Sequence, residues 1–352
     1  MAMTSGAAAS ADFDSLYRDL RAAHLYPLWR IERDLLPAHP KPRAIPWVWR
    51  AAEVYPLGER AIRAVPVDRG GERRVLGLGN PGLGGAPYAA GTLWGGVQCL
   101  GPGETAPAHR HTPGAIRFVL TGSGVWTTVN GDRCDMRPGD LVLTPAWYWH
   151  DHTNSSDQNM FWFDGLDLPM VEALDAIFYE QYPEYAQPAA EHNKSEQTFT
   201  GSPARYAATA WTANPPPPAP SPLLVYRWPD TSAELTRLGS ERPRDAVVSV
   251  AFANPATGGS VLPTLACSMH RLAPGLLTPA RRRTGNSILV VFRGVGHSTV
   301  GGTRLDWAEG DMFVIPSWAP AAHWSGRGAD LFELSDAPVL QALGLYREEP
   351  VP

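Results

Sequence analysis

The apolar positions of the chain follow two different periods. From residue 12 to residue 36 they recur at helical spacing, which predicts one amphipathic helix ending before Pro37. Between residues 117 and 144 they gather in short runs rich in β-branched and aromatic residues, with glycine-containing turns between them. The sequence Asn130-Gly131 is a strong signal for a two-residue hairpin turn. We therefore expect short antiparallel strands at 117–121, 125–129 and 141–144.

The pattern of this β module, 101–168, occurs a second time in the chain. The later segments 278–284, 294–296 and 310–318 repeat the order of 106–112, 122–124 and 139–147. Short strands joined by tight turns are typical of small barrels and jelly rolls. The expected fold class is therefore all-β dominated, with two double-stranded β-helix (jelly-roll) barrels, an N-terminal helix and a few additional helices, one of them at 169–185.

Composition shifts along the chain divide it further. Residues 1–11 are small and polar and are predicted to be disordered. Residues 12–185 are expected to form a helical arm followed by the first barrel. The polar, irregular stretch 186–222 contains the stiff run Pro215–Pro218 and is interpreted as a Pro-rich linker. Residues 223–352 are then left for the second barrel.

Charge and composition exclude several classes of function. The formal net charge is −5, the isoelectric point is about 6.1 and the sequence has no basic stripe, so we expect no nucleic-acid partner. No apolar run approaches the ~20 residues that cross a bilayer, and the first ten residues lack the pattern of a signal peptide. The three scattered cysteines indicate reduced thiols and a cytoplasmic location.

Three histidines carry the candidate chemistry. His109 and His111 are two residues apart, so on a strand both rings point to the same face. His150 follows the 141–144 strand and can reach the same point from a neighbouring strand. Three neutral imidazoles bind a divalent transition metal and leave coordination positions open. The sequence therefore predicts a three-His metal site in the first barrel.

Two segments resemble the two motifs of cupins: Gly103-(x5)-His109-x-His111 and Gly139-(x5)-Pro145-(x4)-His150-(x3)-Asn154. The resemblance implies a metal-binding barrel, with two departures. The glutamate ligand that often follows the histidine pair is absent, and Trp147 stands where the second motif usually has glycine.

In the second barrel the three ligand positions are Arg281, Arg283 and Ala321, and arginine does not lose its proton. We therefore expect one metal ion per chain and a degenerate, metal-free second barrel.

A bicupin with one three-His site, a leading helix and a Pro-rich linker resembles the gentisate 1,2-dioxygenase family. The segments that carry the resemblance are 80–84, 101–111, 117–119, 149–152 and 164–169. It implies Fe(II), O2 and a small aromatic acid that is cleaved between its carboxylated carbon and the adjacent hydroxylated carbon. It also implies a homo-oligomer, a tetramer in relatives. Three neutral histidines by themselves also suit Mn, Co, Ni or Zn.

The resemblance, together with strand parity, suggests the substrate-binding residues. Arg117 has the parity of an inward-facing residue and matches a carboxylate in geometry, although a surface arginine at a strand end is the alternative. Trp94, Gly96 and Gln98 alternate in phase, so they share one face.

Four further residues are assigned by the resemblance. Arg69 and Arg73 match basic residues over the substrate, with a solvated turn as the alternative. His152 and Asp164 match a histidine and an aspartate near the metal ligands, where the carboxylate would fix the tautomer of an imidazole.

The pair Trp94 and Gly96 favours a particular substrate class. Typical gentisate enzymes carry Tyr and Ala there, whereas this pair resembles relatives that accept salicylates without a second ring hydroxyl. We therefore expect a 5-substituted salicylate, with 5-nitrosalicylate as one candidate. Gentisate and 1-hydroxy-2-naphthoate remain alternatives. A cupin isomerase, a thiol dioxygenase and a metal-binding cupin without catalysis are the other classes left open.

Overall fold

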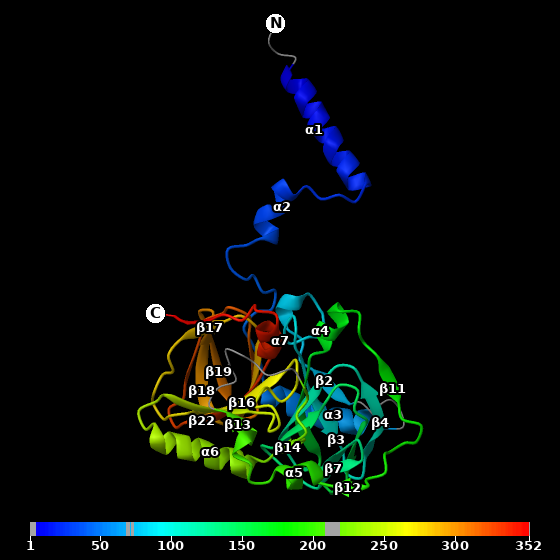
Figure 1. The fold of residues 1–352 in the computed structure, drawn as a ribbon, viewed down its shortest axis with the longest axis vertical. Coiled ribbons are helices and arrows are strands. Elements are labelled where there is room, and N and C mark those ends of the chain that lie inside the picture. Colours follow the sequence, from blue (N-terminus) through cyan, green and yellow to red (C-terminus); the bar gives the residue numbers. More distant parts are fainter. Residues whose placement is uncertain (1–4, 68–70, 72–73, 208–218, 352) are drawn as a thin grey trace. The chain divides into compact units, whose positions relative to one another are not determined.

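The computed structural model describes residues 5–67, 71, 74–207 and 219–351, which divide into a short unit up to Lys41 and a large one from Pro42 onward (Figure 1). The short unit holds α1 (Ser5–Ala22) and α2 (Leu28–Leu35). The single helix expected at 12–36 is thus broken, and the residues expected to be disordered are helical from Ser5. Alanines at 7–9 favour a helix, whereas His24 adopts φ +53° and Pro27 disfavours a helical residue before it.

The first barrel consists of two six-stranded sheets. One has the strand order β14-β8-β5-β10-β3-β2 and the other β11-β4-β9-β6-β7-β12. The strands of the first sheet are β2 (Val75–Gly77), β3 (Trp94–Leu100), β5 (Ala115–Thr121), β8 (Leu141–Thr144), β10 (Met160–Leu166) and β14 (Val225–Tyr226). Those of the second are β4 (Thr105–His111), β6 (Val125–Val129), β7 (Asp132–Met136), β9 (His150–Asn154), β11 (Tyr179–Gln181) and β12 (Glu191–His192).

The second barrel is built on one eleven-stranded sheet, in which the long strand β18 (Ser287–Val300) takes part in both halves. Its other strands are β1 (Trp47–Trp49), β13 (Tyr206–Ala207), β15 (Val247–Phe252), β16 (Ala266–Leu272), β17 (Arg281–Arg283), β19 (Thr303–Ala308), β20 (Met312–Ile315), β21 (Ala321–Trp324), β22 (Ala329–Ser335) and β23 (Glu348–Pro350). The helices of the large unit are α3 (Ala51–Ala64), α4 (Leu168–Ala173), α5 (Lys194–Phe199), α6 (Trp228–Glu241) and α7 (Ala337–Ala342). The mostly-β cupin fold expected from the pattern is confirmed.

The two barrels exchange the segments that precede them. Strand β1 precedes the first barrel but pairs with β20 of the second, and β14 precedes the second but pairs with β8 of the first. Two aspartates at equivalent turns hold the starts of the helices that follow these strands. Asp140 accepts hydrogen bonds from Arg227 and from the backbone N–H of Trp228 at the start of α6. Asp311 does the same for the start of α3, so a boundary between 185 and 223 does not separate two independent barrels.

The expected linker and the expected helix at 169–185 also differ from the structure. Part of the segment 186–222 is ordered as β12, α5 and β13, because the Asp132 carboxylate accepts the backbone N–H groups of Lys194 and Ser195. The run Pro215–Pro218 lies outside the described residues. Only Leu168–Ala173 is helical in the other segment, where Asp175 adopts φ +52° and the chain continues into β11, which pairs with β4.

A shared aromatic core joins the barrels. Phe118 of β5 stacks on Phe332 of β22 with ring centroids 4.2 Å apart, and Phe292 of β18 meets Phe118 edge-on at 5.3 Å. Phe118 and Phe332 are fully buried and belong to one hydrophobic cluster with residues of both barrels. Within the described residues no helix has both the length and the apolar character needed to cross a membrane.

Replacing Phe332 by alanine is expected to destabilise both barrels together. The substitution leaves a cavity in the shared core, and such losses cost about 3–5 kcal/mol. Urea unfolding, followed by tryptophan fluorescence and by far-ultraviolet circular dichroism, should show one transition at lower urea with both probes. Leu343→Ala is the control because its side chain is 64% exposed. A midpoint equal to that of the control would contradict a shared core.

Candidate metal centre and substrate site

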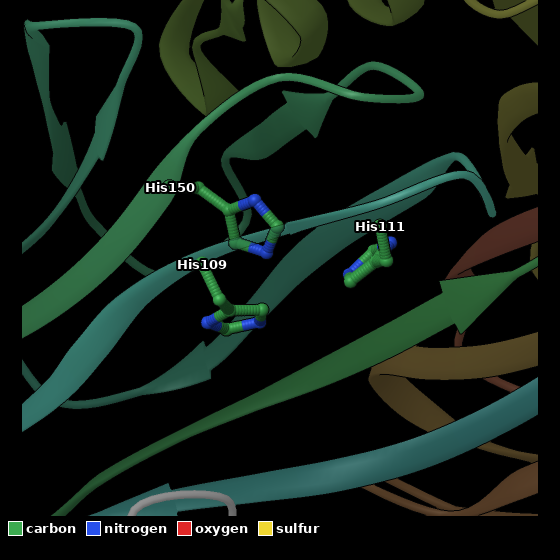
Figure 2. A group of neighbouring side chains, drawn as sticks. All are labelled: His109, His111 and His150. Atoms are coloured by element: carbon green, nitrogen blue, oxygen red, sulfur yellow. The ribbon is translucent and has the colours of Figure 1, made fainter. Parts of the chain in front are cut away.

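The pairing of β4 with β9 brings the three histidines together. His109 lies directly opposite His150, and His111 is two residues further along β4. The ring centroid of His150 is 4.3 Å from that of His109 and 4.9 Å from that of His111. One ring nitrogen from each of the three lies within 4.8 Å of the others. Figure 2 shows the three rings converging from the two strands, as the sequence predicts.

Backbone carbonyls fix the tautomer of each ring. The Nδ1 atoms of His109, His111 and His150 lie 2.8, 2.7 and 2.9 Å from carbonyl oxygens two residues away, those of Pro107, Pro113 and Tyr148. A carbonyl can only accept a hydrogen bond, so each Nδ1 carries the proton. Each neutral ring therefore presents the lone pair of Nε2, which is the atom that binds a metal.

Burial disfavours protonation of one of the three rings. His150 is buried, and its Nε2 has no hydrogen-bond partner among the described residues. Burial first, and then the neighbouring His109 and His111, hold the pKa of His150 well below its ordinary value. A buried imidazole lone pair without a partner is costly unless something binds it. The three residues therefore fit a divalent metal ion such as iron.

The facing sheet supplies a second row of polar residues. Asp164 of β10 lies between Gly96 of β3 and Arg117 of β5, and residues directly opposite each other on paired strands point to the same face. Gln98 lies opposite Trp162 in the next row of that face. The ring of Trp162 is 5.3 Å from that of His152, which is on β9 of the other sheet. The two polar rows therefore face each other across the barrel interior.

Arg117 is the buried cation of this row. Its side chain is 4% exposed, and its Nη1 donates to Thr144 Oγ1. Its Nε lies 3.4 Å from Asp164 Oδ1 in an ion pair that is too poorly aligned for a hydrogen bond, so Nε has no hydrogen-bond partner within the described part of the chain. Burial lowers the pKa of Arg117, but the group stays a cation. The alternative of a surface arginine is wrong.

Asp164 contacts different groups from those the sequence suggested. Trp162 Nε1 donates to Asp164 Oδ1 at 3.0 Å, and the carboxylate faces Arg117 rather than an imidazole. Burial raises the pKa of Asp164 to about 6, against the opposing effect of Arg117. The ring nitrogen Nδ1 of His152 instead lies 2.8 Å from Thr127 Oγ1. A hydroxyl and three carbonyls, not a carboxylate, orient the four imidazoles.

Trp94 and Gly96 form one packing unit. A Cβ atom on Gly96 would lie 2.6 Å from the ring of Trp94 and 2.7 Å from Val75. Glycine is therefore needed at this position for the indole to lie where it does, rather than only to make room for a ligand. Arg69 and Arg73 lie outside the described residues, and their placement over the substrate stays a prediction.

Sequence reasoning missed three residues of the site. Thr144, Trp162 and Thr127 are buried and hydrogen-bonded to Arg117, Asp164 and His152 respectively. Their strand parity was readable in the sequence. Their partners depend on the register between strands that are far apart in the chain, which parity does not give.

The turn before His150 explains one departure from the cupin motif. Trp147 adopts φ +65°, a left-handed conformation that glycine adopts at less cost, and Trp318 has the same φ at the equivalent turn of the second barrel. The backbone N–H groups of both tryptophans donate to equivalent carbonyls, those of His111 and Arg283. The guanidinium of Arg110 lies 4.3 Å from the Trp147 ring centroid, a stacking contact that glycine could not make.

The second barrel keeps the register without the ligands. Arg281 lies opposite Ala321, as His109 lies opposite His150. Neither a guanidinium nor a methyl group donates a lone pair to a metal. The metal-binding chemistry of the described residues is therefore concentrated in the first barrel.

Fold and site together define the class. Residues 96–166 match the Cupin domain family model, and that range contains all three histidines. The molecule is therefore a cupin with one three-His site facing a buried arginine, an arrangement suited to binding a metal beside an acid.

Comparison with known proteins identifies the family. Over 345 residues the chain is 44% identical to a gentisate 1,2-dioxygenase from Streptomyces sp, covering 95% of this chain and 94% of that protein. It is 36% identical to a 5-aminosalicylate 1,2-dioxygenase from Comamonas sp, covering 96% and 90%. The crystal structure of salicylate 1,2-dioxygenase from Pseudoaminobacter salicylatoxidans with gentisate superposes with a TM-score of 0.86 at 40% identity, covering 96% and 94%. The chain belongs to the gentisate/salicylate 1,2-dioxygenase family of aromatic ring-cleaving enzymes.

Removing one imidazole should remove the metal. With His109→Ala we expect iron content to fall from about one ion per chain to near zero after anaerobic Fe(II) loading and desalting, because two neutral imidazoles hold Fe(II) weakly. Metal analysis by plasma mass spectrometry measures this. His192→Ala is the control, since that ring is 59% exposed. Full iron retention in His109→Ala would place the metal elsewhere.

The raised pKa of Asp164 predicts a pH-dependent stability. The folded state holds the proton of this carboxyl up to pH of about 6, whereas the unfolded chain releases it near pH 3.9. The free energy of unfolding of the wild type therefore falls as the pH rises from about 4 to 6. Above about pH 6 the contribution of Asp164 is constant.

Asp164→Asn does not titrate, so in metal-free protein its free energy of unfolding should improve relative to wild type across that window. Urea unfolding at pH 4, 5, 6 and 7 measures the difference. The exposed Asp157→Asn should run parallel to the wild type. A difference that does not change with pH would mean that Asp164 is already ionised at pH 4.

Proposed function

We propose that this chain is an Fe(II)-dependent dioxygenase that inserts both atoms of O2 between the carboxylated carbon and the adjacent hydroxylated carbon of a salicylate-type acid. The observation that carries the proposal is the buried Arg117, whose Nε has no hydrogen-bond partner among the described residues and whose row faces the three histidines. A cation at this position is suited to a carboxylate that enters the same barrel. The whole-chain relatives that act on hydroxybenzoates support it.

Three residues would hold the cofactor. His109, His111 and His150 offer three Nε2 donors, and three protein ligands leave further coordination positions of a divalent ion for other ligands. When bound there, Fe(II) would supply open coordination positions for a chelating substrate and O2, and would pass electron density from the substrate ring to O2. The carboxylate and the ortho hydroxyl of a salicylate are the groups that can chelate in this way.

The protein's own contribution is to orient the carboxylate and to exclude water. The guanidinium of Arg117 can donate to a carboxylate with two N–H groups in a fixed geometry. Gln98, which is 6% exposed, lies on the same inner face and can donate a further hydrogen bond. Asp164 balances the charge of Arg117 in the substrate-free protein, and its raised pKa allows it to take up a proton instead. The charged group of Arg117 is thus held in position for an anionic substrate, and binding of that substrate would offset the cost of burying the charge.

His152 is suited to accept a hydrogen bond. The hydroxyl of Thr127 donates to Met136 Sδ at 3.1 Å, so its oxygen can accept from Nδ1–H of His152. Nε2 then keeps its lone pair. Burial, and then the charge of Arg117, hold the pKa of His152 well below its ordinary value, so the ring is neutral at pH 7. We assign it a hydrogen bond from the ortho hydroxyl of the substrate, because a ring with so low a pKa is a weak base.

The substrate class follows from Trp94. Its indole lies over Gly77 and Gly96, and it brings no hydroxyl to the inner face that could bind a 5-hydroxyl group of the substrate. We therefore propose a 5-substituted salicylate, such as 5-nitrosalicylate or 5-aminosalicylate, as the preferred substrate. Gentisate is the second candidate, favoured by the 44% identical relative and by the solved salicylate enzyme with gentisate.

A substrate panel tests reaction and preference together. Purified, Fe(II)-loaded enzyme is assayed for O2 uptake and ultraviolet absorbance with gentisate, salicylate, 5-nitrosalicylate, 5-aminosalicylate and 1-hydroxy-2-naphthoate. We expect one O2 per substrate and the highest kcat/KM with a salicylate that lacks the 5-hydroxyl. Trp94→Tyr should shift the preference toward gentisate, and Arg117→Met should raise KM by about 10- to 100-fold, the cost of a lost charged hydrogen bond.

The outcomes test the reaction, the role of Trp94 and the carboxylate partner separately. Uptake with gentisate alone would retain the reaction and reject the role given to Trp94. No uptake with any of the five acids despite bound iron would reject the dioxygenase. An unchanged KM in Arg117→Met would move the carboxylate to another residue, with Arg304→Met as the exposed control.

A further inference from the structure

The interior of the second barrel contains a cavity of about 570 Å³. Its lining includes Arg281, Arg283, Ala321 and His323, which stand at the positions that His109, His111, His150 and His152 occupy in the first barrel. The volume is within the range of pockets that hold small molecules. The second barrel has therefore kept a cavity at the equivalent place while losing the metal donors.

A guanidinium stands in that cavity at the place of a metal ligand. Arg283 Nη2 donates to Ser287 Oγ at 2.6 Å and to Glu333 Oε1. Within the described chain no partner is found for its Nε–H or for its Nη1–H groups. Arg283 lines the cavity, so these donors are available to a molecule inside it.

A row of hydrogen bonds holds Arg283 in place. Ser249 Oγ lies 2.7 Å from Nδ1 of His270, and Nε2 of His270 lies 2.8 Å from Glu333 Oε2. Burial alone would raise the pKa of Glu333, but Arg283 and the hydrogen bond from His270 hold that pKa well below its usual range. Glu333 is thus a fixed anion at neutral pH, and it fixes the orientation of the Arg283 fork.

The remaining lining indicates the class of ligand. Three guanidinium groups line the cavity, and each pairs with one carboxylate: Arg281 with Glu348, Arg282 with Glu349 and Arg283 with Glu333. Burial lowers the pKa of His323 to about 4, which keeps that ring neutral. The apolar part of the lining is Leu272, Leu289, Ile315 and Leu331. Guanidinium N–H groups of Arg283 that face the cavity beside apolar surface suit a small carboxylate with an apolar or aromatic body.

We propose that the second barrel is a binding site for a small organic monocarboxylate, in which N–H donors of Arg283 stand where the first barrel has a metal-binding histidine. The carboxylate accepts a hydrogen bond from Nη1–H of Arg283, and the apolar body lies against the leucine and isoleucine side chains. The site requires neither iron nor an ortho hydroxyl. It is independent of the reaction proposed for the first barrel.

The probe is 4-fluorobenzoate, a monocarboxylate without the hydroxyl needed for chelation, titrated into metal-free protein and followed by ¹⁹F NMR. Arg117→Met serves as the background, because it removes the carboxylate partner of the first barrel. In this background we expect saturable binding to remain. Adding Arg283→Met with Glu333→Gln should weaken it at least tenfold; the double change removes both charges and leaves no buried ion unpaired.

A steric variant and a control complete the test. Ala321→Phe fills the cavity without altering its charges and should also weaken binding at least tenfold, so it decides the question if the double variant does not fold. Arg304→Met, an exposed change on β19, should leave the dissociation constant unchanged. Circular dichroism and thermal unfolding confirm folding of each variant. Loss of all binding in Arg117→Met alone, or undiminished binding in Ala321→Phe, would overturn the proposal.

Discussion

The cost of burying charge in an apolar interior governs both barrels. An ionised group taken out of water is stable only with a partner of opposite charge or with several hydrogen bonds. The second barrel meets this requirement internally, because Arg283 and Glu333 neutralise each other and His270 satisfies the carboxylate further. The first barrel meets it only in part. Arg117 and Asp164 form a long, poorly aligned pair, and burial holds the pKa of His150 well below its ordinary value.

The incomplete pairing in the first barrel leaves buried polar groups that are suited to bind ligands. An imidazole lone pair and a guanidinium N–H, both buried and lacking hydrogen-bond partners among the described residues, are unfavourable in the empty site and become favourable when a cation and an anion bind. The same two strands that bring His109 opposite His150 leave no freedom for the rings to turn away, because three backbone carbonyls hold the Nδ1 protons. The rigid scaffold therefore holds these polar groups in position for ligands, whereas in an exposed site water would form hydrogen bonds with them.

How far the sequence predicts each feature of this structure depends on how far apart along the chain the residues lie that determine the feature. The histidine triad was predictable because strand parity and two turn signals lie within 42 residues, from His109 to His150. The internal repeat was predictable because equivalent turns use equivalent residues. The partner of Asp164 was not, because it depends on the register of β10 with β5, nearly fifty residues away along the chain. The exchange of β1 and β14 was not predictable either, because strands of three and two residues are too short to show an alternating pattern.

Gly96 shows why a local reading of specificity is incomplete. From the sequence, glycine at this position makes room for a ring of the substrate. In the structure the room is already taken by the indole of Trp94, which a Cβ on Gly96 would contact at 2.6 Å. Any change at 96 therefore moves Trp94 first and the substrate second. Under the proposed function, an effect of residue 96 on substrate preference would therefore act through Trp94, because two side chains cannot occupy the same volume.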